Sequence, residues 1–397
     1  MSTQLRDSAT RLPAERAGAT GIGLYVHWPF CASKCPYCDF NSHVAGAIDH
    51  HRWRAAFRRA LAHAAGETGP ARLASIFFGG GTPSLMAPRT VAAVIDEATR
   101  LWRLDADAEI TLEANPGSVE AGRFRGYRLA GVNRISIGIQ SLDDEALRRL
   151  GRLHSAAEAR MALGIAHSLF DRLSFDLIYA RQDQSLAGWR AELAGALDLA
   201  GEHLSLYQLT IEPGTRFGDL ARVGRLRGLP PPDLAADMFA LTQEMCEAAG
   251  LPAYEISSHA RPGGESRHNL IYWRGGAYIG VGPGAHGRLM RDGVWIATSD
   301  RRDPAAWLAA VERNGHGRAE ETVVSGSERA EELLMMGLRL REGFDTARHD
   351  ALAEAPLDPV RLDELVAAGF LWREGSRIGT TAAGRPVLDA LIARLLG

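Results

Sequence analysis

The chain has 397 residues, of which 46% are hydrophobic and 23% are charged, and its formal net charge is −3. These values are ordinary for a globular protein and suit one large domain with a smaller one, or two to three average domains. The near-neutral balance argues against a global attraction to nucleic acid or anionic lipid. No apolar run is long enough to span a bilayer, and residues 1–20 are polar, without the apolar stretch of a signal peptide. We therefore expect a cytoplasmic protein without a membrane span and with a flexible N-terminal segment over residues 1–20.

Strand-like apolar runs alternate with helical stretches from residue 21 onward. Strands separated by helices of this length predict βαβ units and a parallel sheet. Five or six such units predict an α/β fold with a partial or complete (β/α) barrel, in which chemistry collects at the C-terminal ends of the strands. The predicted strands are Gly23–His27, Ser75–Phe78, Glu109–Glu113, Arg134–Ile139, Leu173–Ile178 and His203–Thr210. The predicted helices are Asp49–Ala65, Pro88–Arg103, Val119–Leu129, Asp143–Leu150, Ala156–Ser168 and Leu186–Ala200.

The second half of the chain is less regular. The stretch Pro213–Pro232 is rich in Gly, Pro and Arg and predicts a long loop, and Tyr254–Gly287 is predicted to be irregular. We expect one domain over 21–290 and a second over 303–397, whose pattern of helix, short hairpin and helix resembles a winged-helix module. Such modules often bind DNA. Because the arginines of this tail are scattered among acids, we expect a packing or partner domain and no nucleic-acid partner.

Three of the four cysteines lie within eight residues, directly after the first predicted strand. Cys31, Cys35 and Cys38 have the spacing C-x3-C-x2-C. Structural zinc sites and thiolate-only clusters need four ligands. Three thiolates leave one iron of a cubane cluster without a protein ligand, so a small molecule can bind there. Soft thiolates select iron–sulfur clusters, so an iron–sulfur cluster accounts best for the three cysteines.

Zinc ligation, disulfide bonding and purely structural packing are the alternative roles for these cysteines. A Cys3His zinc site with His27 or His43 stays open. A disulfide framework is disfavoured because three clustered cysteines cannot staple a domain of this size. Purely structural thiols are disfavoured because Pro36 would interrupt a core helix. The fourth cysteine, Cys246, lies in a helical stretch and is expected in a core.

Polar side chains and glycines follow the predicted strands. The second strand ends in the glycine turn Gly79–Gly81, which permits a close approach of main chain to a ligand. Acids, an amide and an arginine lie at or between later strand ends. Structural ion pairs and a simple tight turn account for each feature alone, because a buried carboxylate needs a partner. Together these groups suit a zwitterionic, ribose-bearing ligand, with the arginine facing its carboxylate. The polar residues are Glu113, Gln140, Arg152 and Asp176.

The cysteine spacing, with the aromatic Tyr37 before the third cysteine, resembles the radical SAM superfamily. The resemblance implies a partial (β/α) barrel of the radical SAM type with a smaller, mostly helical, winged-helix-like C-terminal domain. It implies that Cys31, Cys35 and Cys38 ligate a [4Fe–4S] cluster. It also implies S-adenosylmethionine on the open iron, where one electron from the cluster would yield a 5′-deoxyadenosyl radical. The residues implied around S-adenosylmethionine are Tyr25, Tyr37, Gly80, Gly81, Thr82, Glu113, Gln140, Arg152 and Asp176.

Within that superfamily, Tyr25–Cys31, the glycine turn and Asp176–Tyr179 are similar to the oxygen-independent coproporphyrinogen III oxidase family. The oxidases of this family carry a further cysteine two residues after the third, where this chain has Phe40. The chain is instead similar to the HemW-type heme chaperones, including their H-N-x-x-Y-W segment at His268–Trp273. One departure is that Ala180–Gln184 replaces the family's usual proline- and glycine-containing turn, which puts the shape of that loop in doubt.

The resemblance implies heme as a third ligand, with His268, Asn269, Tyr272 and Trp273 as its binding residues. From the residues alone, a structural histidine with two core aromatics accounts for the same segment. We expect a heme chaperone that delivers heme to an apo-hemoprotein, such as a membrane-bound respiratory enzyme, and that is a monomer or a dimer. The alternative is an oxygen-independent coproporphyrinogen III oxidase, a catalyst of oxidative decarboxylation in porphyrin biosynthesis.

Overall fold

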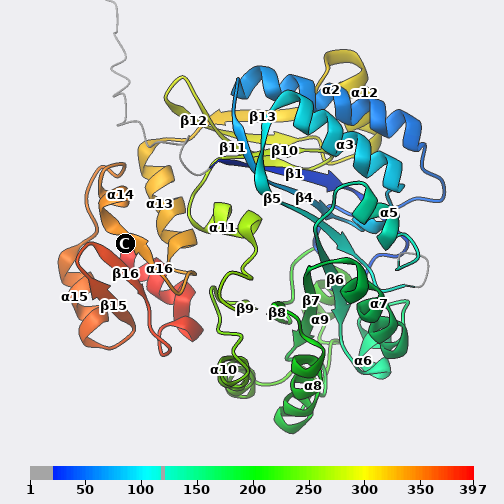
Figure 1. The fold of residues 1–397 in the computed structure, drawn as a ribbon. Coiled ribbons are helices and arrows are strands. Elements are labelled where there is room, and N and C mark those ends of the chain that lie inside the picture. Colours follow the sequence, from blue (N-terminus) through cyan, green and yellow to red (C-terminus); the bar gives the residue numbers. More distant parts are fainter. Residues whose placement is uncertain (1–20, 118–120) are drawn as a thin grey trace, which may run out of the picture.

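The computed structural model describes residues 21–117 and 121–397, built on an open sheet of eleven strands (Figure 1). Seven neighbouring strands, β10-β1-β4-β5-β6-β7-β8, are parallel. Antiparallel β11, β12 and β13 extend one edge, and antiparallel β9 ends the other. The strands are β1 (Ile22–Trp28), β4 (Arg72–Gly80), β5 (Arg103–Ala114), β6 (Arg134–Gln140), β7 (Arg172–Tyr179), β8 (His203–Gln208), β9 (Ser258–Ala260), β10 (Tyr278–Val281), β11 (His286–Arg291), β12 (Val294–Asp300) and β13 (Arg318–Val323).

Helices between the parallel strands cover the sheet, as the alternating pattern predicts. The strand interiors read as continuous apolar runs because both faces are buried, and Leu24, Phe78 and Leu112 are fully buried in the core. The α/β fold with its partial barrel is confirmed, and the sheet formed by the described strands does not close. The helices are α2 (His50–Thr68), α3 (Pro88–Leu101), α5 (Phe124–Leu129), α6 (Asp144–Arg149), α7 (Ala156–Leu169), α8 (Leu186–Leu199) and α10 (Pro232–Ala248).

Side-chain caps explain where several helices begin. Asp49 accepts hydrogen bonds from the backbone N–H groups of His51 and Arg52, so α2 begins at His50. Ser155 and Glu158 form a capping box at the start of α7. The predicted start of a helix at Val119 lies outside the described residues.

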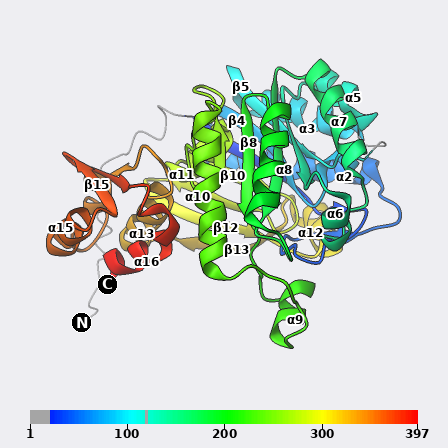
Figure 2. The same ribbon diagram turned by 90° about the horizontal axis from the view of Figure 1, so that it is seen from below.

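Two stretches contain more regular structure than the sequence predicts. The predicted loop over 213–232 contains α9 (Arg216–Arg222), which Thr215 caps, and which projects from the body of the molecule in Figure 2. The predicted irregular stretch over 254–287 contains β9, β10 and the short helix α11 (Arg267–Trp273). Both helices are only seven residues long, so their hydrophobic periodicity is too short to read from sequence.

The segment after residue 303 first completes the large sheet. Helix α12 (Pro304–Asn314) packs on α2 through a stacked pair, Trp307 and Trp53, whose ring centroids are 5.4 Å apart. Strand β13 then pairs with β12. We therefore propose that the C-terminal unit begins near residue 324, rather than at 303.

The C-terminal unit has its own core and a small antiparallel sheet in the order β14-β16-β15. Leu334, Phe344 and Ile378 lie in that core. Its elements are α13 (Gly326–Gly337), β14 (Phe344–Asp345), α14 (Thr346–Asp350), α15 (Pro359–Ala367), β15 (Leu371–Glu374), β16 (Arg377–Thr380), a 3-10 turn (Arg385–Val387) and α16 (Leu388–Leu396).

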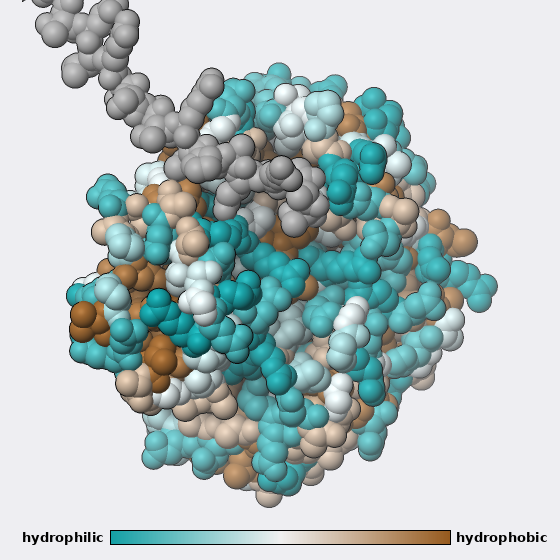
Figure 3. Space-filling model, turned by 60° about the vertical axis from the view of Figure 1, so that its left-hand side comes forward, coloured by the Kyte–Doolittle hydropathy of each residue, from teal (hydrophilic) through white to brown (hydrophobic). Residues whose placement is uncertain are grey.

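Within the described residues, no helix combines the length and the apolar character that crossing a bilayer requires. Hydrophilic residues predominate on the face of the molecule shown in Figure 3, and the hydrophobic ones are scattered among them.

Candidate functional site

The predicted ligand residues lie toward the C-terminal ends of neighbouring parallel strands. Tyr25 is in β1, Gly80 ends β4, Glu113 is near the end of β5, Gln140 ends β6 and Asp176 is in β7. Because neighbouring parallel strands share their direction, these residues lie along the same end of the sheet. Tyr25, Gly80 and Glu113 line one cavity of about 820 Å³.

The cysteine loop follows β1 and so lies at the same C-terminal end of the strands. Cys31 is in the two-residue strand β2 (Phe30–Cys31), which pairs with β3 (His43–Val44). Cys31, Cys35 and Cys38 are all free and half-buried. Burial raises the pKa of Cys31, although the Thr82 hydroxyl, which donates to Cys31 Sγ at 3.3 Å, opposes this. Burial likewise raises the pKa of Cys38.

The donor set fits a thiolate cluster better than a single zinc ion. In the described part of the chain, no three His, Cys, Asp or Glu side chains converge as ligands of one metal ion. His27 is also engaged: its Nε2 donates to the Asn41 carbonyl at 2.9 Å, which leaves Nδ1 to accept from the Tyr25 hydroxyl at 3.0 Å. The Cys3His alternative with His27 or His43 therefore gains no support, whereas three free thiols on one loop suit three different irons of a cluster.

Arg152 joins the cysteine loop to the strand ends. Its Nη1 approaches Cys35 Sγ at 3.5 Å, and its Nη2 donates to Asn115 Oδ1 and to the Gly138 carbonyl, each at 2.6 Å. Its Nε is buried without a hydrogen-bond partner. A cation held in this way suits a carboxylate or a thiolate beside it.

The glycine turn is held against the segment that enters the cysteine loop. The N–H groups of Gly81 and Thr82 donate to the carbonyls of Trp28 and Phe30 at 2.7 and 2.8 Å. Gly80 has a φ of +111°, and a Cβ there would lie 2.6 Å from the His27 ring. A Cβ on Gly79 would lie 2.8 Å from the Tyr25 ring and 3.3 Å from Glu113 Oε2. Only glycine fits this close approach of backbone to ring and carboxylate.

Two carboxyl groups at the strand ends are held partly neutral. Burial, followed by the charge of Asp176, raises the pKa of Glu113 to about 8. Burial raises the pKa of Asp176 to about 6, against the opposing effect of the Ser205 hydroxyl. Glu113 lines the cavity, and a carboxyl group with such a pKa beside a cavity is typical of ligand sites. An ammonium group or a hydroxyl donor would be a suitable partner for both.

Gln140 shows local backbone strain. Its φ is +74°, a conformation that residues other than glycine rarely adopt. The turn aims the side chain back along β6, so that a Cβ on Gly138 would lie 2.9 Å from Gln140 Nε2. Strain of this kind tends to cluster at ligand sites.

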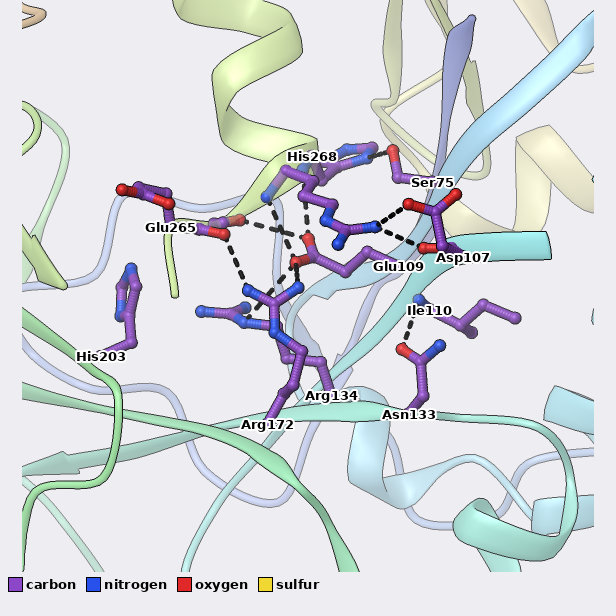
Figure 4. Close-up of polar contacts among 12 residues, drawn as sticks. Ser75, Asp107, Glu109, Ile110, Asn133, Arg134, Arg172, His203, Glu265 and His268 are labelled. Atoms are coloured by element: carbon purple, nitrogen blue, oxygen red, sulfur yellow. Dashed lines mark hydrogen bonds and ion pairs between the residues drawn. The ribbon is translucent and has the colours of Figure 1, made fainter. Parts of the chain in front are cut away.

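The predicted heme residues are on α11, and His268 is buried rather than open (Figure 4). Its Nδ1 is 2.7 Å from the Ser75 hydroxyl and its Nε2 is 2.6 Å from the Tyr272 hydroxyl. Burial lowers its pKa to about 3. Both ring nitrogens are therefore engaged, so the geometry does not support axial ligation by His268, and its role in heme binding stays a prediction.

The other predicted heme residues are more accessible. Asn269, Tyr272 and Trp273 are half-buried. Tyr272 and Trp273 line the same 820 Å³ cavity as Tyr25 and Glu113. The guanidinium of Arg339 lies over the Trp273 ring at 4.6 Å. The structure thus brings two of the four predicted heme residues to the cavity that three of the nine predicted S-adenosylmethionine residues line.

Sequence reasoning missed the residue that positions α11. Glu109 is buried in β5, accepts from the His268 and Arg267 N–H groups at 3.1 and 3.2 Å, and from Arg172 Nη1 at 2.7 Å (Figure 4). Burial disfavours its charge, but the guanidinium groups of Arg134 and Arg172 outweigh this and lower the pKa of Glu109. The charged group that stabilises the start of α11 is 158 or 159 residues away in sequence, so no local signal reveals it.

Sequence reasoning also missed a contact behind the cysteine loop. The Phe217 N–H in α9 donates to the Pro36 carbonyl at 2.8 Å, and the rings of Phe217 and Tyr37 have centroids 6.5 Å apart. The side chain of Tyr37 therefore lies between the backbone of the cysteine loop and α9. An apolar residue, Phe217, within a Gly/Pro/Arg-rich stretch was the only local signal of this contact.

Comparison with known proteins places this fold and site in a class. A family model described as the radical SAM superfamily matches residues 25–186, and one described as the HemN C-terminal domain matches residues 324–387. In structure, coproporphyrinogen III oxidase (HemN) from Escherichia coli superposes with a TM-score of 0.78 at 21% identity, over 96% of this chain and 92% of that one. At this identity the likeness concerns the fold alone. These matches define a radical SAM protein.

Relatives in sequence narrow the class. Radical S-adenosyl methionine domain-containing protein 1, mitochondrial, of Bos taurus is 40% identical over 395 residues, which are 96% of this chain and 88% of the relative. Heme chaperone HemW of Escherichia coli (strain K12) is 39% identical over 380 residues, 94% of this chain and 98% of the relative. The chain belongs to the HemN/HemW family of radical SAM proteins.

Proposed function

We propose that this protein is a HemW-like heme chaperone. It would carry a [4Fe–4S] cluster and S-adenosylmethionine, bind heme, and deliver heme to an apo-hemoprotein, for which a membrane-bound respiratory enzyme is our candidate. We propose that the protein is located in the cytoplasm and is a monomer or a dimer. We propose no nucleic-acid partner. The full-length likeness to heme chaperone HemW supports the proposal.

For the cluster, the supporting features are the three free thiols of Cys31, Cys35 and Cys38 on one loop. Thr82 donates to the first thiol and Arg152 approaches the second. Hydrogen bonds and charge near cluster sulfurs tune reduction potential. When bound, such a cluster supplies one-electron chemistry to its ligand.

For S-adenosylmethionine, the support is the row of strand-end groups. The glycine turn brings backbone close to the cavity, and Glu113 and Asp176 offer acceptors for an amine or for ribose hydroxyls. Arg152 offers a cation for a carboxylate. Tyr25 supplies an aromatic wall of the cavity, Tyr37 supplies an aromatic ring beside the cysteines, and Gln140 offers a side-chain amide from a strained backbone.

Phe40 is the residue that favours a heme chaperone over an oxidase. It stands where the oxidases that this chain resembles have a further cysteine, and its side chain is 60% exposed on the wall of the 820 Å³ cavity. An exposed aromatic at a cavity mouth suits contact with a flat apolar ligand. It supplies no thiol for porphyrinogen chemistry.

One experiment tests the proposal. The full chain is reconstituted anaerobically with iron and sulfide, and the same sample is assayed for heme binding, heme transfer to an apo-hemoprotein, 5′-deoxyadenosine formation and coproporphyrinogen III turnover. We expect saturable heme binding and transfer, without porphyrinogen turnover. Turnover of the porphyrinogen would instead establish the oxidase, and absence of heme binding would refute the chaperone.

Two cysteine variants provide a matched comparison. Cys35→Ala removes a proposed cluster ligand and should abolish the iron–sulfur absorption. Cys246→Ala removes a fully buried thiol of α10 and should leave cluster loading unchanged. Equal loading of both variants would count against the proposed ligand set.

A further inference from the structure

The 820 Å³ cavity extends from the strand ends to the space between β11 and α13. Its wall includes His286 and Arg288 from β11, Glu332 and Met336 from α13, and Arg302 from the segment after β12. The whole cavity has a volume within the range of roughly 300–1,000 Å³ that is typical of small-molecule and cofactor sites. The wall on this side is formed by residues that the predicted ligand sites do not include.

An ion pair holds the two walls together. Arg288 Nε donates to Glu332 Oε1 at 2.9 Å. Residues two apart on a strand project from the same face, so His286 lies on the same face of β11 as Arg288. Residues four apart on a helix share a face, so Met336 lies one turn beyond Glu332 on α13. His286 therefore lies beside Arg288 on the strand wall, and Met336 lies beside Glu332 on the helix wall.

His286 is the accessible imidazole of this wall. Two histidines line the cavity in the described part of the chain, His27 and His286. His27 uses both nitrogens in hydrogen bonds, whereas the exposed His286 ring has no hydrogen-bond partner among the described residues. His286 is therefore the histidine of this cavity whose ring nitrogens can bind a ligand.

The surroundings of His286 suit a flat anionic metal chelate. Arg302 is exposed on the same wall, and its guanidinium makes no ion pair within the described residues. The carboxylate of Glu332 is neutralised by Arg288, and that of Asp300 accepts from Trp307 Nε1 at 2.7 Å. The exposed Glu320 adds one further carboxylate to this wall, against the guanidinium of Arg302. Phe40 and Trp273 add aromatic surface. An imidazole, an unpaired arginine and aromatic rings together match iron, a propionate and a porphyrin plane.

We propose that His286, and not the buried His268, supplies the protein ligand to heme iron, and that Arg302 faces a heme propionate. This inference rests on the proposed heme-binding function and assigns the residues that carry it out.

The test is a titration of the full-length protein with ferric heme, followed by Soret absorption and electron paramagnetic resonance. Wild type should show a nitrogen-ligated spectrum. His286→Ala should lose that signature and weaken binding by roughly 10- to 100-fold, the range seen when metal coordination is disturbed. Added imidazole should restore the signature by filling the vacated position. His51→Ala, an exposed histidine of α2, is the matched control and should behave as wild type.

The outcomes separate this inference from the proposed function. If wild type binds heme saturably and His286→Ala has an unchanged spectrum and affinity, the inference is overturned and the chaperone stands. If wild type shows no saturable heme binding, both fail. Arg302→Gln should weaken binding of ferric heme while leaving the affinity for its diester, which lacks the propionate charge, unchanged. Equal weakening for both ligands would exclude the propionate contact.

Discussion

Arg152 places its guanidinium 3.5 Å from the Sγ atom of Cys35, although 117 residues separate the two in sequence. The same side chain is anchored on the β5 and β6 ends through Asn115 and the Gly138 carbonyl. The contact connects the loop that carries the thiols to the row of strand-end groups. The two halves of the candidate site are thus joined by one cation.

Replacing Arg152 by Ala should lower the free energy of unfolding by about 1–3 kcal/mol, since Asn115 and the Gly138 carbonyl lose a charged donor. Arg152→Lys keeps the charge but cannot form the fork, and should recover only part of the loss. Urea unfolding of the cluster-free protein measures this. Arg148→Ala, on an exposed surface pair with Glu145, is the control and should cost less than about 1 kcal/mol.

Glu109 should be far more important for stability than Asp107, although both contact the start of α11. Glu109→Ala leaves the buried Arg134 and the partly buried Arg172 without their shared carboxylate, and should cost about 3–5 kcal/mol. Asp107 pairs with Arg267 at the surface, so Asp107→Ala should cost less than about 1 kcal/mol. Denaturant midpoints of the two variants give the comparison. Similar midpoints would contradict the anchoring role of Glu109.

Gly80→Ala should destabilise the protein and weaken S-adenosylmethionine binding. The residue has a φ of +111°, and the new Cβ would meet the His27 ring at 2.6 Å, so the turn must shift. Gly66→Ala, in the exposed part of α2 with no atom within 4 Å of the new Cβ, should instead stabilise by about 0.5–1 kcal/mol. Thermal unfolding and equilibrium dialysis of the two variants measure both effects.

The stability of the ligand-free protein should fall as pH rises toward 8. The pKa of Glu113 is about 8 in the folded state, against an ordinary value of 4.5. Between these values the unfolded chain has lost a proton that the folded chain retains, so each rise in pH favours unfolding. This stabilisation is complete below about pH 4.5 and is lost as pH passes through 8.

Glu113→Gln should reduce that slope, because each pKa unit corresponds to about 1.4 kcal/mol. Asp176, whose pKa is about 6, accounts for part of the slope that remains. Unfolding midpoints measured from pH 5 to 9 provide the profile. Glu145→Gln alters an exposed carboxylate and should retain the slope of wild type; an unchanged profile for Glu113→Gln would disprove the assignment.

The parallel strands and the strand-end groups were predictable because each has a signal within a short stretch of sequence. Phe77–Gly80 is a buried run that ends in glycine, and Glu113 interrupts an apolar strand. The position of α11 was not predictable, since it depends on Glu109 in a distant strand. The burial of His268 was missed for the same reason: its partner Ser75 is 193 residues away. Local patterns reveal elements, whereas long-range polar contacts decide which side chains remain open.

The hydrogen bond between Phe217 and Pro36 has a consequence for how the cluster can be followed. It ties the cysteine loop to α9, a projecting helix with exposed arginines at Arg216 and Arg222 (Figure 2). We expect a shift of the loop on gaining or losing iron to change how readily trypsin cuts at these arginines. The rate of trypsin cleavage in this helix should therefore report cluster occupancy, and it can be measured on a gel without any optical signal.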